Sequence, residues 1–72
     1  MKAEMKKKLT TMQEQLVAQK AIATDLREEE AEYANGLDND DKLEESEGRQ
    51  ELLSELEESL DVCTSLLYDL LH

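Results

Sequence analysis

The side chains in this 72-residue chain that could do covalent or metal chemistry are few and scattered. The only histidine, His72, is the last residue, and a terminal side chain is poorly held in place. The only cysteine, Cys63, has Asp61 and Asp69 as the first charged residues before and after it along the chain, whereas a reactive thiolate needs a positive environment. Without a second histidine the chain has no Cys–His dyad in a packed site and no di-iron pair of Glu-x-x-His motifs. We therefore predict that the chain is not an enzyme.

An acidic stretch at residues 38–41 could be read as the start of a calcium-binding loop. An EF-hand loop needs an acid or Asn at its fifth position, Gly at its sixth and Glu at its twelfth. Counted from Asp38, these positions hold Lys42, Leu43 and Arg49. We therefore expect no metal and no cofactor, and we interpret Asp38 as the N-cap of a helix.

The charges are unevenly placed along the chain. Nineteen acidic and eight basic side chains give a net charge of −11. Residues 1–27 carry six basic and three acidic groups, net +3, and residues 28–72 carry two basic and sixteen acidic groups, net −14. This balance disfavours binding to nucleic acid or to an anionic membrane, and it favours a basic protein surface as partner, or simply high solubility.

Other features of composition point to a helical protein of the cytoplasm. Pro, Trp and Phe are absent, and Gly36 and Gly48 are the only glycines. No apolar stretch approaches the roughly 20 residues that a membrane-spanning helix needs, and the lysine-rich start is not followed by a signal-peptide core. A single cysteine fits a reducing compartment, so we expect a cytoplasmic location.

Apolar residues at alternating steps of three and four predict a first helix over about residues 2–35, with a coiled-coil seam. Its seam members are Met5, Leu9, Met12, Leu16, Ala23, Leu26 and Tyr33. Asn35-Gly36 is a turn signal, and we expect Gly36 to end the helix in the left-handed conformation.

The same spacing predicts a second helix over about residues 39–71. Its seam members are Leu53, Leu56, Leu60, Cys63, Leu67 and Leu70. The turn, about residues 36–38, is too short for anything but an antiparallel return. We therefore predict an all-α, coiled-coil-like antiparallel hairpin over residues 1–72, with residue i opposite roughly 74 − i. Leu26 then lies over Gly48, which would explain a glycine there by close approach.

Some apolar residues lie beside the predicted seam and cannot all be buried in it. A chain this short is usually marginal alone, so we expect a partner or a second copy to complete the hairpin. The surplus is either part of a homodimeric bundle or a docking face for a different protein. We single out as candidate partner-binding residues Val17, Ile22, Val62, Leu66 and Tyr68.

Three segments carry a resemblance to a known family. They are the turn Asn35-Gly36-Leu37-Asp38, the leucine-spaced acidic stretch 51–60, and Leu66-Leu67-Tyr68. Two equal helices with these segments resemble the small co-chaperones of the needle subunit in bacterial type III secretion systems. The resemblance extends from about Leu9 to Leu71.

The resemblance implies a cytoplasmic co-chaperone that belongs to a virulence-associated export system. With a helical-repeat chaperone, it would keep the needle subunit soluble and monomeric until export. Such contacts are made by apolar helix faces, and the family has no catalytic motif to transfer.

Two other functions remain open at this point. The first is a self-assembling or adaptor hairpin of another system. The second is an acidic inhibitor that imitates nucleic acid, because residues 28–58 hold fourteen acidic and two basic groups, net −12. A mimic needs these acids on one exposed face.

Overall fold

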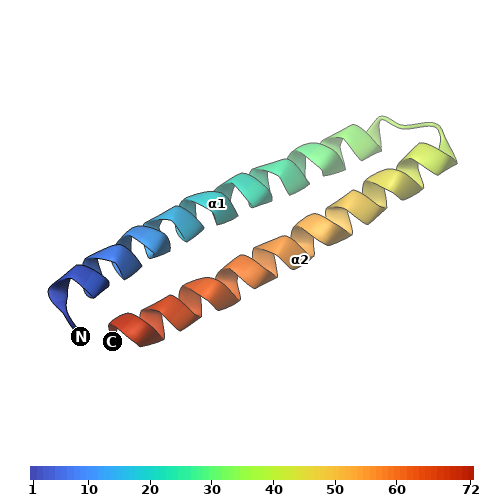
Figure 1. Cartoon of the computed structure of the whole chain (residues 1–72). Helices are drawn as coiled ribbons and strands as arrows, with labels where there is room; N and C mark the ends of the chain where they lie inside the picture. Colours follow the sequence, from blue (N-terminus) through green and yellow to red (C-terminus); the bar gives the residue numbers. More distant parts are fainter.

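The computed structural model describes residues 1–72 as two long helices that pack side by side and antiparallel (Figure 1). Helix α1 covers Ala3–Asn35 and helix α2 covers Asp40–Leu71. The Cα atoms span 56 × 14 × 12 Å, so the molecule is a rod. This confirms the predicted all-α helical hairpin. Neither helix is long and apolar enough to cross a membrane.

The turn differs from the prediction at both helix ends. Gly36 has φ −94° and ψ 0°, so the expectation of a left-handed glycine is wrong; α1 ends instead with Gly36 N–H donating to Tyr33 O and Leu37 N–H donating to Ala34 O. The N-cap of α2 is Asn39 and not Asp38. The Asn39 Oδ1 atom accepts the N–H groups of Asp41 and Lys42 at 2.9 and 3.3 Å. An extended residue directly before the first helical turn is the one that can reach those N–H groups.

The helices are also displaced along each other relative to the predicted pairing. Figure 1 shows that α2 starts beyond the end of α1, and that α1 starts beyond the end of α2. Lys20 consequently pairs with Asp61 and Glu30 with Arg49, where a pairing of 74 − i would have put residues 54 and 44. The cause is the linker, which continues along the direction of α1 before the chain turns back.

This displacement removes the proposed reason for Gly48. A Cβ atom placed on Gly48 would meet no atom within 4 Å, so the predicted close approach to Leu26 is wrong. Gly48 is simply an exposed glycine inside a helix.

Only one of the two predicted seam columns of α1 faces α2. Leu9, Leu16 and Ala23, seven residues apart, are turned inward as expected. The second inward column is expected three residues after each of these positions, but it lies four residues after them. It consists of Gln13, Lys20 and Arg27, and it continues to Ala34, four residues after the half-buried Glu30. The residues predicted for that column are about half exposed: Met5, Met12, Leu26 and Tyr33.

Helix α2 shows the same change. Ser46, Leu53, Leu60 and Leu67 form one inward column. The other is Gln50, Glu57, Thr64 and Leu71. The residues expected there, Leu56, Cys63 and Leu70, are exposed, so the prediction of a buried Cys63 is wrong. The physical reason is that the polar column carries cross-helix ion pairs that periodicity alone does not reveal.

Little of the molecule is fully buried. Ala23 and Leu67 are the buried apolar residues, and Ser46 is the buried polar one. The Ser46 hydroxyl donates to the Glu30 carbonyl at 3.4 Å and accepts from the Gln50 side-chain amide at 3.4 Å. The interface is therefore apolar toward the chain termini and polar toward the loop.

The adjacent leucines at 66 and 67 provide a matched test of this packing. Leu67 is 6% exposed and Leu66 is 59% exposed. We expect Leu67→Ala to lower the free energy of unfolding by about 2–3 kcal/mol through lost packing, and Leu66→Ala to change it by less than about 0.5 kcal/mol. Denaturant unfolding, in a concentration range where the midpoint does not depend on concentration, measures both. Equal losses would contradict the rotation of α2 described above.

The open surroundings of Gly48 give a second prediction. Gly48→Ala should raise the free energy of unfolding by about 0.5–1 kcal/mol, because alanine loses less backbone entropy in a helix. Ala18, on the outward side of α1, is the matched control: Ala18→Gly should lower stability by a similar amount. Thermal unfolding followed by circular dichroism measures both, and a loss of stability in Gly48→Ala would restore the close-approach explanation.

Candidate partner-binding face

The rotation of the two helices gathers most of the exposed large apolar side chains on one side of the hairpin. Inward positions repeat every seven residues, so the columns beside them also run along the whole rod. The column three residues after Leu9 and Leu16 on α1 and the column three residues after Leu53 and Leu60 on α2 fall on the same side, because the helices are antiparallel and rotated alike. We call this side the apolar face. It carries Met5, Met12, Ile22, Leu26, Tyr33, Leu52, Leu56, Cys63, Leu66 and Leu70, all exposed.

The opposite side, which we call the polar face, holds most of the contacts between charged groups of the two helices. Lys20 Nζ lies 2.6 Å from Asp61 Oδ1. Thr24 Oγ1 donates to Glu57 Oε2 at 3.1 Å, and Arg27 Nε donates to Glu57 Oε1. These contacts hold the helices in the observed rotation.

The five predicted partner-binding residues do not form one surface. All five are exposed, but Ile22 and Leu66 lie on the apolar face, Val62 points away from α1, and Val17 and Tyr68 belong to the polar face. The Tyr68 ring packs against the His72 ring with centroids 4.2 Å apart and a tilt of 31°.

Residue-by-residue reasoning missed the main members of the apolar face because it assigned them to the seam. They are Met5, Met12, Leu26, Tyr33, Leu56 and Leu70. The signal that could have found them is the charge pattern of the alternative column. Lys20 and Arg27 on α1 meet Asp61 and Glu57 on α2 only if that column faces inward.

The residues considered for chemistry are far apart. Cys63 is exposed on the apolar face, and His72 is at the chain end beside Tyr68. The acidic turn is used for capping, since Asn39 caps α2 and Asp40 and Asp41 lie in its first turn. No group of three or more His, Cys, Asp or Glu side chains is placed to hold a metal ion.

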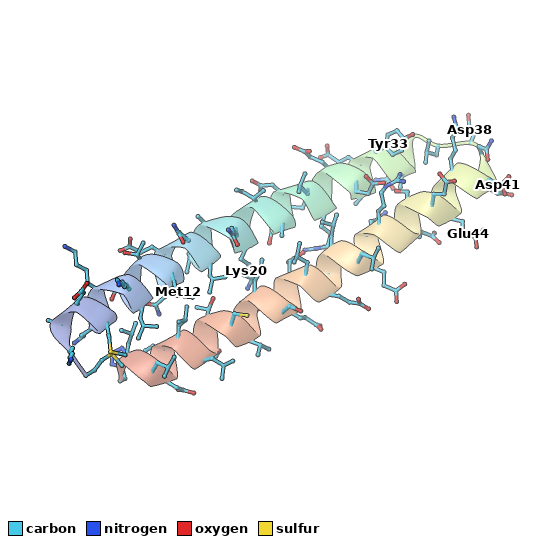
Figure 2. The ribbon with its side chains drawn as sticks, in the orientation of Figure 1. Met12, Lys20, Tyr33, Asp38, Asp41 and Glu44 are labelled. Carbon is cyan, nitrogen blue, oxygen red and sulfur yellow. The ribbon has the colours of Figure 1, made fainter.

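Charge is strongly segregated along the rod. Residues 21–59, the half nearer the loop, carry fifteen acidic and three basic groups, net −12. Residues 1–20 and 60–72, the half nearer the termini, carry five basic and four acidic groups, net +1. Figure 2 shows Asp38, Asp41 and Glu44 around the loop end, where they point away from the rod in different directions. The apolar face therefore runs from a nearly neutral end to a strongly negative one.

Two carboxylates inside the interface are held in their charged form by arginine. The Arg27 guanidinium, with help from the Thr24 hydroxyl, keeps the pKa of Glu57 below its ordinary value. The Arg49 guanidinium, 2.7 Å from Glu30 Oε1, likewise lowers the pKa of Glu30. Both carboxylates are largely covered by the facing helix, and their positive partners offset the cost of that burial.

The lowered pKa of Glu57 predicts a pH dependence. Its stabilising effect is fully present above the unfolded-state pKa of about 4.3 and is lost as the pH falls through the lower folded-state value. The difference in free energy of unfolding between the wild-type chain and Glu57→Gln should therefore be largest near neutral pH and shrink toward zero in acid.

Urea unfolding at a series of pH values measures this difference. Glu58→Gln is the control, because it removes the same charge from the next residue, which is exposed and has no ion-pair partner. If the two variants showed the same pH dependence, the Arg27–Glu57 contact would have no special role.

Comparison of the chain with known protein families, curated proteins and solved structures finds no match. The function must therefore be argued from the face itself. Its properties are a column of exposed, mostly apolar side chains on each helix, interrupted by Gln19 on α1 and by Arg49 on α2, together with a nearly neutral end and a strongly acidic end. No catalytic constellation accompanies them.

Proposed function

We propose that the hairpin is a non-enzymatic binding module whose apolar face holds an amphipathic helix of another protein. The observation that carries this proposal is the distribution of exposed hydrophobic residues. Nine of the thirteen large hydrophobic side chains that are exposed lie on the apolar face. Large contiguous apolar patches on small proteins mark interaction surfaces.

The shape of the face suits a helix as ligand. On the apolar face, exposed apolar side chains stand on both sides of the boundary between the two helices, such as Leu26 on α1 and Leu56 on α2. A third helix laid along this line would place apolar residues at three- and four-residue steps against both helices. Burial of such side chains contributes roughly 25 cal/mol per Å² of apolar area, which a marginal two-helix hairpin needs.

In this proposal, the identity of the partner is inferred from the resemblance to needle-subunit co-chaperones. The ligand is a type III secretion needle subunit, whose own amphipathic helix would assemble prematurely if uncovered. A helical-repeat chaperone completes the complex in the cytoplasm. The hairpin architecture supports the proposal. The apolar face supports it too, because it would cover the amphipathic helix of the subunit.

The charge distribution limits the kinds of partner segment that would bind. The net charge of −12 on the loop half repels nucleic acid and favours a protein segment with Lys or Arg at the end that lies near the loop. The acids are spread around both helices and the turn. Glu29 borders the apolar face, Glu47 lies on the polar face, and Glu55 points outward, so they do not form the single phosphate-like face that a nucleic-acid mimic requires.

Affinity purification of the tagged chain from its native cells, followed by mass spectrometry, tests the proposal. We expect co-purification of a small helical-repeat protein together with a short secreted subunit. Leu66→Asp, on the apolar face, should abolish recovery of the subunit, whereas Val17→Asp, on the polar face, should leave it unchanged. Leu66 and Val17 are 59% and 56% exposed, so the two changes are closely matched.

Three results would contradict the proposal. Recovery of a nucleic-acid-binding protein would favour the inhibitor, and recovery of nothing but the chain itself would favour a self-assembling adaptor. Equal loss of binding in both variants would show that the two faces do not differ. Circular dichroism of each purified variant establishes that it is folded before its binding is interpreted.

A further inference from the structure

Most apolar residues of the apolar face are spaced symmetrically about the middle of the rod, and the binding of a different protein would not require this symmetry. We propose that, in the absence of another partner, a second copy of this chain covers the apolar face in antiparallel orientation, which makes a four-helix bundle. Each α1 then lies on the α1 of the other copy, and each α2 on the other α2. The two-fold axis crosses the rod at its middle.

On α1 the exposed column is evenly spaced about its centre. Met5, Met12, Gln19, Leu26 and Tyr33 follow at intervals of seven residues, or two helical turns. When two such helices run antiparallel with Gln19 at the axis, Met12 of one copy faces Leu26 of the other, and Met5 faces Tyr33. Every apolar member of the column then meets an apolar member.

On α2 the same operation also matches apolar residues. Leu56 faces Cys63, and Leu52 faces Leu66, about a centre at residues 59–60. The outermost pair of this column is not apolar, because Leu70 faces Arg49, which keeps its contact with Glu30 of its own chain. The contact of Lys20 with Asp61 places this centre beside the centre of α1 at Gln19. One two-fold axis can therefore serve both helices, which is the condition for an isologous interface.

The charges select the antiparallel arrangement. A parallel pair would place two loop halves, each of net charge −12, against each other, whereas an antiparallel pair places each loop half against a terminal half of net charge +1. At residue level, Lys8 and Glu29 both border the apolar face of α1, and the antiparallel pairing brings Lys8 of one copy to Glu29 of the other. Within its own chain Lys8 has only an exposed contact with Glu4, at 3.7 Å.

The area available is sufficient for a stable dimer. The Cα atoms span 56 Å along the rod and 14 Å across it. Face-to-face packing therefore covers roughly 800 Å² on each copy, the area per partner of a standard protein interface. Gln19 of α1 and Ser59 of α2 are the polar residues at the centre of this interface, and a polar pair at a position such as Gln19 fixes register and orientation.

A charge exchange between positions 8 and 29 tests the arrangement. In purified protein, Lys8→Glu alone and Glu29→Lys alone should each weaken dimerisation about tenfold, since each dimer contains the pair twice. The double variant should restore the wild-type dissociation constant. Positions 8 and 29 are about 30 Å apart on one straight helix, so a rescue can arise only between copies.

Sedimentation equilibrium gives the dissociation constants. A chain that stays monomeric at every concentration would overturn the proposal, as would single variants that leave the constant unchanged or a double variant weaker than both. These measurements use the purified chain alone. Their failure leaves the proposed binding of another protein untouched, and failure of the co-purification leaves the dimer untouched.

A cysteine at the axis provides the second, orientation-specific measurement. On a Cys63→Ser background, Gln19→Cys should form an intermolecular disulfide rapidly under mild oxidation, because the two copies of residue 19 meet at the axis. Ala18→Cys, on the outward side of α1, should do so far more slowly. Equal rates would overturn the antiparallel arrangement even if the chain is a dimer.

Discussion

The structure depends on the pairing of Lys20 and Arg27 of α1 with Asp61 and Glu57 of α2. A helix can present only about one stripe of its surface to a single neighbour. Each helix here has an inward column of mostly apolar residues, and on either side of it stands a second column, one mainly apolar and one polar. The complementary charges bring the polar column inward. The apolar column is thereby left on the outside, and the exposed face of the molecule follows from that choice.

The arrangement also explains why the hairpin has so little core. Exposed ion pairs contribute little, and half-covered ones must first offset their own desolvation. The polar column therefore adds little to the stability of the hairpin. Ala23 and Leu67 are the buried apolar residues of the isolated hairpin, and most of its large apolar side chains stay exposed on the apolar face. Burial of those side chains would stabilise the hairpin. Covering that face with another helix, or with another copy, would supply burial that the two-helix interface lacks.

The sequence was sufficient to predict the class of fold and part of the packing. The absence of proline and the three- and four-residue spacing predict two helices, and Leu9, Leu16, Leu53 and Leu60 are turned inward as that spacing requires. The second inward column could not be predicted from periodicity, because steps of three and of four from these leucines are equally regular. The choice depends on contacts such as Lys20 with Asp61, 41 residues apart along the chain. The same choice of column decides where the partner-binding candidates lie, and it puts Ile22 on the apolar face and Val17 on the polar face.

The segregation of charge links the two proposed occupants of the apolar face. A second copy brings a terminal half of net charge +1 to each loop half of net charge −12, so most of the repulsion within the acidic half remains uncompensated. A partner helix that carries several Lys or Arg residues near the loop would neutralise more of this charge while burying the same apolar side chains. Both occupants gain the hydrophobic contribution, and the electrostatic contribution favours the basic partner. If a second copy and a basic helix compete for the apolar face as proposed, exchange of the copy for the helix would be favoured more at low salt than at high salt, because salt screens the electrostatic contribution that distinguishes them.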